Sequence, residues 1–278
     1  MRGRAAAGRA MSTLAEALGL DDEPVPTRDL VLLHGWGMNA AVWDALPAAL
    51  TADLVQHRIE LPGHGHSPFG PPCDGGEAAL IAWADACLEA APERAIWLGW
   101  SLGGLVALAA ALRAPKRVRG LILMTATPRF VQATDWRPAM AEETLAQFHD
   151  GLIADPAGTL ARFLALQVRG SDHARETLRT LRHELAARPA PNPAALALGL
   201  DLLRDEDLRG PLPDLRPPSL WIFGSCDTLV PPRVAERIDL LLPNARSAVV
   251  AGAAHAPFLS HPLETAALVR DFVEGLEP

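Results

Sequence analysis

The stretch of sequence that decides the fold is Ala95-Ile96-Trp97-Leu98-Gly99-Trp100-Ser101-Leu102-Gly103-Gly104, in which an apolar run stops at a serine flanked by glycines. The apolar run predicts a buried strand, and the small apolar residues at 106–112 predict a helix after the serine. The five residues from Gly99 to Gly103 fit the pattern G-x-S-x-G, in which small residues let the backbone turn sharply and present the serine hydroxyl. Ser101 is therefore a candidate nucleophile.

Length and composition are typical of one globular domain. The 278 residues, 49% of them hydrophobic, suffice to bury a full core and to carry an inserted element. No run reaches the roughly 18 uninterrupted apolar residues of a membrane span, so we expect no membrane association. Three cysteines without paired spacing argue against a disulfide framework and fit the reducing cytoplasm. The net charge of −8 disfavours general binding to nucleic acid or anionic lipid.

The first 29 residues are interpreted as an N-terminal tail, partly disordered, ahead of a domain that covers residues 30–278. Arg2, Arg4 and Arg9 occur with no acidic residue among the first ten positions, but the apolar centre of a secretory signal is missing. A short helix is predicted over residues 14–20, before a loop that contains Pro24 and Pro26.

Strands and helices alternate along the domain. Strands are predicted at residues 30–33, 54–60, 95–100, 118–124, 219–224 and 245–250, and helices at residues 42–50, 78–90, 106–112, 232–242 and 262–276. This alternation predicts an α/β fold with a mostly parallel sheet and helices on both faces. From about residue 128 to residue 192 no strand pattern occurs, so we predict an inserted helical lid, interrupted by Pro138, Pro156 and Gly170. A lid at the carboxyl ends of the strands would cover Ser101.

A catalytic serine needs a histidine to remove its proton and a carboxylate to orient that histidine. In the α/β-hydrolase fold these groups follow strands in the order serine, acid, histidine. His255 follows the last predicted strand, whereas His261 begins the closing helix. Asp227 follows the strand at 219–224, whereas the other late acids lie in polar connections. We therefore predict Ser101, Asp227 and His255 as the catalytic residues.

The loop His34-Gly35-Trp36-Gly37 follows the first strand and is placed like the loop that supplies an oxyanion-hole donor in such hydrolases. The second donor comes from the residue after the nucleophile, so the sequence nominates the backbone N–H groups of Trp36 and Leu102. His64 and His66 lie in another loop without a third residue at ligand spacing, and no metal site is predicted.

With these residues placed, the sequence from about residue 30 to residue 273 resembles the pimeloyl-(acyl-carrier protein) methyl ester esterases of biotin synthesis, the BioH family. The matching runs are residues 32–37, 95–106, 162–167, 253–258 and 260–262. The resemblance implies a serine carboxylesterase without cofactor that hydrolyses the methyl ester of a pimeloyl chain on an acyl-carrier protein. The sequence departs from the family at the N-terminus, where the usual leading strand is not recognisable.

The resemblance also implies which residues bind the substrate. They are Trp36, Ser101, Leu102, Phe163, Leu164, Ala165, Leu166, Gln167 and His255. The resemblance further implies that the acyl-carrier protein is the binding partner. We expect the protein itself to be a monomer.

Basic residues in the predicted lid could receive an acidic carrier. Arg175, Arg179 and Arg182 occur at i, i+4 and i+7, on one helical face, and Arg162 could extend the patch. Arginine binds carboxylates and phosphates in a bidentate manner. A solvated arginine face in an arginine-rich protein remains the alternative.

Other functions stay open at this point. A general short-chain carboxylesterase or a carbon–carbon bond hydrolase would use the same three catalytic residues. A ligand sensor that keeps these residues but turns over negligibly belongs to another class. Substrate profiling separates the first two from a carrier-dependent esterase, and ligand binding without product formation would identify the third.

Overall fold

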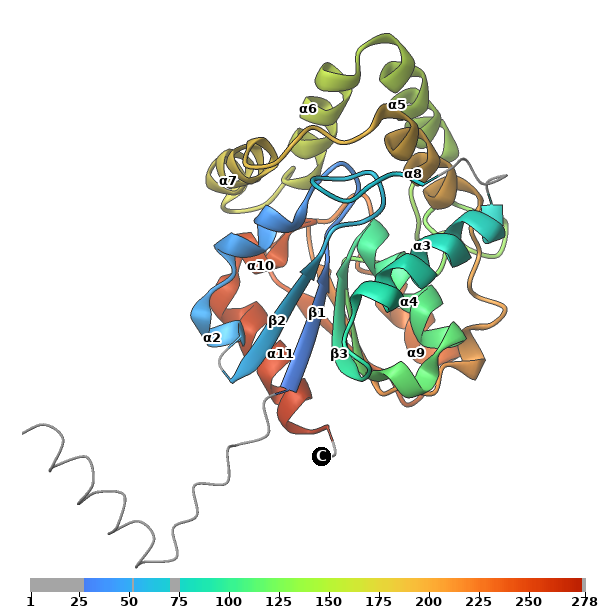
Figure 1. Ribbon diagram of the computed structural model, residues 1–278, viewed down its shortest axis with the longest axis vertical. Coiled ribbons are helices and arrows are strands. Elements are labelled where there is room, and N and C mark those ends of the chain that lie inside the picture. Colours follow the sequence, from blue (N-terminus) through green and yellow to red (C-terminus); the bar gives the residue numbers. More distant parts are fainter. Residues whose placement is uncertain (1–27, 52, 71–75, 277–278) are drawn as a thin grey trace, which may run out of the picture.

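The computed structural model describes residues 28–51, 53–70 and 76–276. The predicted tail with its helix at 14–20 lies outside them, except for Arg28 and Asp29, which begin the first strand instead. Six parallel strands form one sheet in the order β2-β1-β3-β4-β5-β6 (Figure 1). They are β1 (Arg28–Leu33), β2 (Leu54–Ile59), β3 (Ala95–Trp100), β4 (Val118–Met124), β5 (Ser219–Gly224) and β6 (Arg246–Val250). The prediction of an α/β fold with a parallel sheet is confirmed.

Burial along the strands explains why each lies where it does in the sheet. All residues of β3 and β5 are buried, which is typical of central parallel strands covered on both faces. The edge strands β2 and β6 contain exposed positions. Successive residues of β1 point to opposite faces, so that Val31 and Leu33 belong to one apolar cluster and Leu30 and Leu32 to another.

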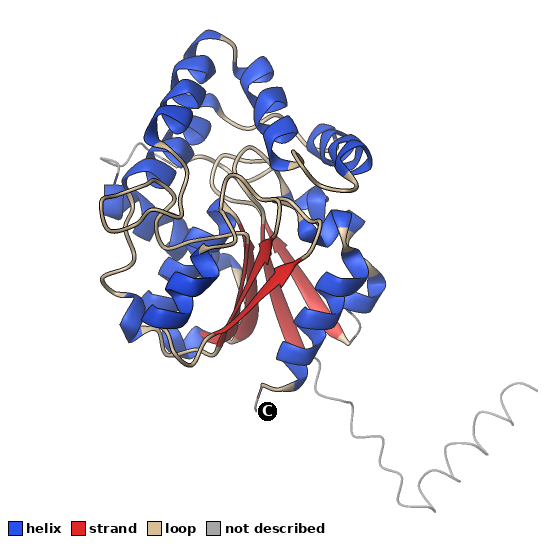
Figure 2. Ribbon diagram, turned by 180° about the vertical axis from the view of Figure 1, so that it is seen from behind, coloured by secondary structure: helices blue, strands red, loops and turns tan. Residues whose placement is uncertain are grey.

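Helices cover both faces of the sheet (Figures 1 and 2). On one face lie α3 (Gly76–Ala90), α4 (Leu102–Arg113) and α9 (Val234–Leu241). On the other lie α2 (Ala48–Thr51), α10 (Pro257–Ser260), α11 (Pro262–Glu274) and the 3-10 turn η1 (Ala40–Ala45). Two further turns, η2 (Pro115–Arg117) and η3 (Leu212–Asp214), precede β4 and β5.

The helix predicted over residues 42–50 is wrong in its continuity. The structure has η1 and α2 there, separated at Leu46 and Pro47. Leu46 has φ −65° and ψ 134°, an extended conformation that the residue before a proline prefers. The helical periodicity of this stretch therefore did not reveal the break.

Four helices lie between β4 and β5, above the carboxyl ends of the strands (Figure 1). They are α5 (Glu142–Ala154), α6 (Pro156–Gln167), α7 (Ala174–Ala186) and α8 (Pro193–Asp205). This helical segment, called the insertion below, ends later than the predicted residue 192. Asn192 caps α8 by accepting a hydrogen bond from Ala194 N–H at 2.8 Å, and Pro193 is its first residue. Proline favours a helix start at this position, so Pro193 begins a further helix here.

Candidate active site

Ser101 lies in a sharp turn between β3 and α4. Its φ of 56° and ψ of −120° are sparsely populated for a residue with a side chain, and its N–H donates to Met124 O at 3.0 Å. A Cβ on Gly103 would come 2.4 Å from the carbonyl oxygens of Leu33 and His34. A Cβ on Gly99 would come equally close to Gly103 O. The two glycines let β1, β3 and α4 approach closely enough to hold this turn.

Asp227 follows β5 and is fixed by the backbone. Its side chain is fully buried, and Oδ1 accepts hydrogen bonds from the N–H groups of Leu229 at 2.8 Å and Val230 at 3.1 Å. Oδ2 lies 2.7 Å from Nδ1 of His255. The structure thus brings together the acid and the histidine that the sequence selected separately.

His255 follows β6 and is held through both of its backbone polar groups. Its carbonyl oxygen accepts hydrogen bonds from Trp100 Nε1 at 2.7 Å and Thr125 Oγ1 at 2.8 Å. Its N–H donates to Gln167 O in the insertion at 2.9 Å. Since Trp100 directly precedes Ser101, the first of these bonds ties the histidine loop to the serine turn.

The imidazole of His255 is arranged as a proton acceptor. With Asp227 accepting from Nδ1–H, the lone pair lies on Nε2, which is buried and has no hydrogen-bond partner among the described residues. A buried nitrogen without a partner is costly and calls for a role, and a proton arriving there would be stabilised by the carboxylate. The arrangement can therefore activate a hydroxyl.

The loop at residues 34–37 lies against the serine turn. A Cβ on Gly35 would be 3.3 Å from the Cβ of Ser101. Within the described ranges, neither the N–H of Trp36 nor that of Leu102, the first residue of α4, has a hydrogen-bond acceptor. The indole of Trp36 donates to Leu196 O at 2.9 Å and packs edge-on against Phe163, with ring centroids 4.8 Å apart.

The predicted substrate-binding residues of α6 face different directions. Phe163 and Gln167 are buried, and Phe163 packs in the cluster that contains Trp36. Leu164 packs in the opposite cluster, Leu166 is half-buried and Ala165 is exposed. Consecutive helical residues are about 100° apart, so five in a row cannot share one face. Neither side-chain polar atom of Gln167 has a partner in the described part of the chain.

The predicted docking arginines lie on two helices of the insertion. Arg175, Arg179 and Arg182 are exposed on α7 and form no ion pair with any described residue. Arg162 is on α6, where Nη2 donates to Thr159 Oγ1 at 2.7 Å. The neighbouring leucines of α7 pack inward with Trp43 and Phe258; they are Leu178, Leu181 and Leu185.

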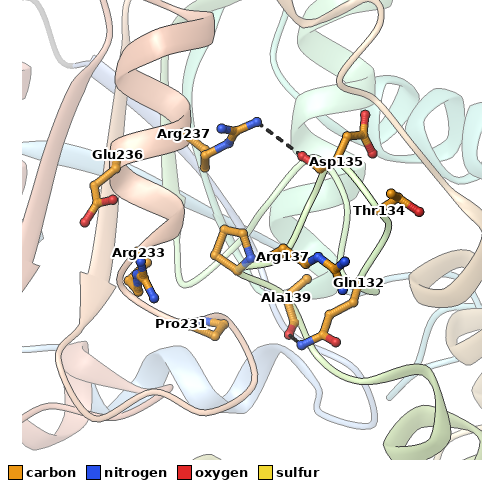
Figure 3. A pocket seen from close by; sticks show the side chains of 10 residues that line it. Gln132, Thr134, Asp135, Arg137, Ala139, Pro231, Arg233, Glu236 and Arg237 are labelled. Carbon is orange, nitrogen blue, oxygen red and sulfur yellow. Dashed lines mark hydrogen bonds between the residues drawn. The ribbon is translucent and has the colours of Figure 1, made fainter.

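A surface cavity of about 490 Å³ lies apart from these residues, between the segment 132–139 and the start of α9 (Figure 3). Arg237 lines it and donates to Asp135 O at 3.2 Å. Arg137 and Arg233 also line it, but so does the carboxylate of Glu236. This mixture of charges favours no one ligand, and no predicted site residue lines the cavity.

Comparisons with known proteins show the fold and the family. A family model described as alpha/beta hydrolase fold matches residues 30–262. An esterase from Thermogutta terrifontis has the same fold, with a TM-score of 0.73, 22% identity and 89% coverage of each chain. A hydrolase from Pseudomonas aeruginosa gives a TM-score of 0.70 and 27% identity, covering 91% of this chain and 92% of that one.

Two curated relatives from Edwardsiella ictaluri and Stenotrophomonas maltophilia are each 46% identical over 250 residues. The alignments cover 89% and 90% of this chain and 94% of each relative. Both are named pimeloyl-(acyl-carrier protein) methyl ester esterase. The chain belongs to this esterase family. The resemblance inferred from the sequence is confirmed, and this family member is a carboxylic ester hydrolase.

Sequence reasoning missed two residues that hold the histidine of this esterase. Trp100 was counted only as part of the serine turn, and Thr125 was not considered, although both donate to the carbonyl of His255. Thr125 has a φ of 45° and directly follows β4. Its place at the carboxyl end of a central strand was the available signal, because ligands of such sheets bind there.

Proposed function

We propose that this esterase hydrolyses the methyl ester of a pimeloyl chain carried by an acyl-carrier protein, giving methanol and the carrier-bound acid. The 46% identity to relatives with that name over 250 residues supports the substrate. The observation that carries the chemistry is the buried His255, whose Nδ1 faces Asp227 and whose Nε2 has no partner in the described residues.

Ser101 acts as the nucleophile in this mechanism. Nε2 of His255 removes the hydroxyl proton while the oxygen attacks the ester carbonyl carbon, and Asp227 stabilises the imidazolium that forms. The imidazolium then donates its proton to the departing methoxide, which leaves as methanol. Water, deprotonated by the same nitrogen, attacks the acyl-serine, and the proton returns to Ser101 as the acid is released.

The negative charge that develops on the carbonyl oxygen is stabilised by the N–H groups of Trp36 and Leu102. A Cβ added to Gly35 would come 3.3 Å from the Cβ of Ser101, and Leu102 begins α4, so both groups belong to segments next to the nucleophile. Loss of one such donor costs about 3 kcal/mol of barrier in serine proteases. The N-terminus of α4, where the helix dipole is positive, also stabilises this negative charge.

The acyl chain is bound between the oxyanion loop and the insertion. Trp36 and Phe163 supply apolar surface, and Gln167 supplies a buried amide that no described residue satisfies. Ser101 is only 2% exposed, which supports movement of the insertion when the substrate enters. We therefore propose that the insertion, predicted as residues 128–192 and continued by α8 to Asp205, acts as a lid.

The carrier docks on the exposed arginine face of the lid, formed by Arg175, Arg179 and Arg182 with Arg162 beside it. The chain as a whole has a net charge of −8, so an acidic partner is attracted only where arginine is concentrated. In the described residues no helix is long and apolar enough to cross a membrane. We place the reaction in the cytoplasm, with a monomeric enzyme.

The test compares a pimeloyl-carrier methyl ester with a small aryl ester. In the variant Arg175→Glu/Arg179→Glu/Arg182→Glu, we expect kcat/KM for the carrier ester to fall at least tenfold, since charge reversal lowers the encounter rate. The aryl ester should be cleaved as by the wild type. The matched control is Arg137→Glu/Arg216→Glu/Arg233→Glu, which reverses three exposed arginines elsewhere and should leave both activities unchanged.

Two results would contradict the proposal. If the wild type cleaves the aryl ester but not the carrier ester, the substrate is wrong and a general carboxylesterase remains. If both triple variants lose carrier activity equally, the docking face is wrong.

A further inference from the structure

Helix α7 connects two loops of the active site. At its C-terminal end, the oxyanion loop is attached through Asn39, whose Nδ2 donates to Leu185 O at 3.1 Å. At its N-terminal end, the histidine loop is attached through Asp172 N–H, which donates to Gly252 O at 3.1 Å. The helix therefore spans the distance between the segment that carries Trp36 and the segment that carries His255.

The side chain of Asn39 makes two hydrogen bonds, one as acceptor and one as donor. It is 1% exposed, and Oδ1 accepts from Ala41 N–H at 2.9 Å, which caps η1. Its amide nitrogen is left to donate to Leu185. Both polar atoms are thus satisfied, one within its own segment and one in the lid, 146 residues away in sequence.

Leu185 lies in the last turn of α7, which ends at Ala186. Carbonyl groups in the last turn of a helix have no intrahelical donor and need another partner. Asn39 supplies that donor for Leu185. The leucine side chain packs in the same apolar cluster as Trp43 of η1, so the helix end and the loop are held by both packing and a hydrogen bond.

Asn39 also ends the turn that contains Trp36. Met38 N–H donates to Gly35 O at 3.2 Å, which closes the turn over Trp36 and Gly37. One side of this turn is fixed by Gly35 against Ser101, where an added Cβ would come within 3.3 Å. The other side is fixed by Asn39, so a shift of Asn39 is passed to the Trp36 N–H over only three residues.

We propose that Asn39 is a positioning residue that holds the Trp36 N–H in the oxyanion hole by tying its loop to helix α7. The inference rests on the proposed function for the role of Trp36, but not on the identity of the acyl carrier. It assigns to the lid a second task besides covering the serine, because α7 fixes a group that must meet the transition state.

Asn39→Ser separates the two hydrogen bonds. A serine is a good N-cap, so the bond to Ala41 N–H is retained, but its hydroxyl is too short to reach Leu185 O as well. Asn39→Asp keeps the shape and the cap and turns the donor into an acceptor that faces a carbonyl. Asn192→Ser is the matched control, since Asn192 caps α8 in the same way, is exposed and lies outside the active site.

The measurement is the kinetics of each variant on the aryl ester and the carrier methyl ester. For Asn39→Ser we expect kcat to fall about tenfold to a hundredfold on both esters while KM stays within about twofold, which is less than complete loss of a donor causes. The inhibition constant of a trifluoromethyl ketone, which forms a tetrahedral oxyanion with Ser101, should rise by the same factor. Asn39→Asp should show at least the same loss, and Asn192→Ser should match the wild type.

Other outcomes would overturn the inference. An unchanged kcat and inhibition constant in Asn39→Ser would show that the link to α7 does not position the donor. Loss of folding at the assay temperature in both Asn39 variants would make the residue structural only. If the wild type does not cleave the carrier ester but Asn39→Ser still lowers kcat on the aryl ester, the inference stands and the proposed substrate fails.

Discussion

Two buried histidines near Ser101 differ in what their ring nitrogens do. His255 donates from Nδ1 to a carboxylate and leaves Nε2 without a partner among the described residues. In His34, Nε2 accepts a hydrogen bond from Leu61 N–H at 3.1 Å, and Nδ1–H donates to Gly35 O at 2.9 Å. Both are almost fully buried, so burial does not distinguish a base from a structural histidine.

The region around His34 also holds His64, and both rings stay neutral. Burial lowers the pKa of His34 to about 3, with a further decrease from His64, whose ring centroid is 5.3 Å away. Burial likewise lowers the pKa of His64 to about 4. No carboxylate in the described part of the chain is bonded to either ring. His64 also has an Nε2 without a described partner, so what distinguishes His255, the base of the proposed mechanism, is its bond to Asp227.

The largest expected effect comes from removing the carboxylate that is bonded to His255. In Asp227→Asn, the carboxylate that holds the imidazole tautomer is lost, and we expect kcat on the aryl ester to fall about 10⁴-fold, as for the equivalent change in serine proteases. Steady-state kinetics measure the loss. The two N–H donors to Oδ1 still have an oxygen to bond, so circular dichroism should be unchanged. A fall of less than tenfold would show that Asp227 is not the orienting acid.

A second experiment tests the neutral pair through pH. Because both pKa values are lowered, the unfolded chain binds protons between pH 6.5 and 4 that the folded chain does not. The contribution of these two histidines to the free energy of unfolding is therefore fully present above pH 6.5 and falls as the pH decreases, by about 1.4 kcal/mol per pH unit for each histidine.

The variant His64→Phe should remove one of these two contributions. It replaces a ring whose Nε2 has no described partner. It also keeps an aromatic ring next to Trp83, whose centroid lies 6.0 Å from that of His64 in the structure. At pH 7 we expect stability within about 1 kcal/mol of the wild type. Urea unfolding at pH 7, 6 and 5 measures how the free energy of unfolding changes with pH. This change should correspond to about one proton fewer in the variant than in the wild type. An identical slope in both proteins would contradict the lowered pKa of His64.

The smallest expected effect concerns backbone strain, which also differs between the two regions. Near His34 and His64 the positive φ angles fall on glycines, namely Gly37, Gly63 and Gly65. At the serine turn and directly after β4 they fall on Ser101 and Thr125, and in the loop before His255 on Gly252. Ser101→Gly should therefore be more stable than Ser101→Ala by about 1 kcal/mol, because glycine adopts this conformation without strain. Both variants should be inactive, and the urea midpoint measures the difference. If Ser101→Ala is as stable as Ser101→Gly, the backbone at Ser101 is not strained.

The sequence predicted the sheet, and it selected Asp227 and His255, which lie in contact, because both inferences depend on local pattern. The strands 118–124 and 219–224 have the predicted limits, since each contains an apolar run, at 121–124 and 220–223, that is buried in the centre of the sheet. The positions of Asp227 and His255 followed from the rule that catalytic groups lie just after parallel strands.

Features that depend on contacts between distant segments were not predictable in this way. The bond from Asn39 to Leu185 joins two segments that no periodicity relates. The different orientations of Phe163, Leu164 and Ala165 became clear only when α6 was placed against its neighbours. His34 was seen as part of a glycine-rich loop, and its bond to Leu61 required β1 and the loop after β2 to be adjacent.

The hydrogen bond from His255 N–H to Gln167 O has a consequence for protein engineering. The sheet holds the carbonyl of this residue through Trp100 and Thr125, while the lid holds its N–H. Deleting the insertion would therefore not produce a minimal esterase with an open cleft, because the histidine that we propose as the base would lose one of its supports. Exchange of lids between relatives should preserve the segment that ends at Gln167 and confine changes of substrate preference to the helical surface beyond it.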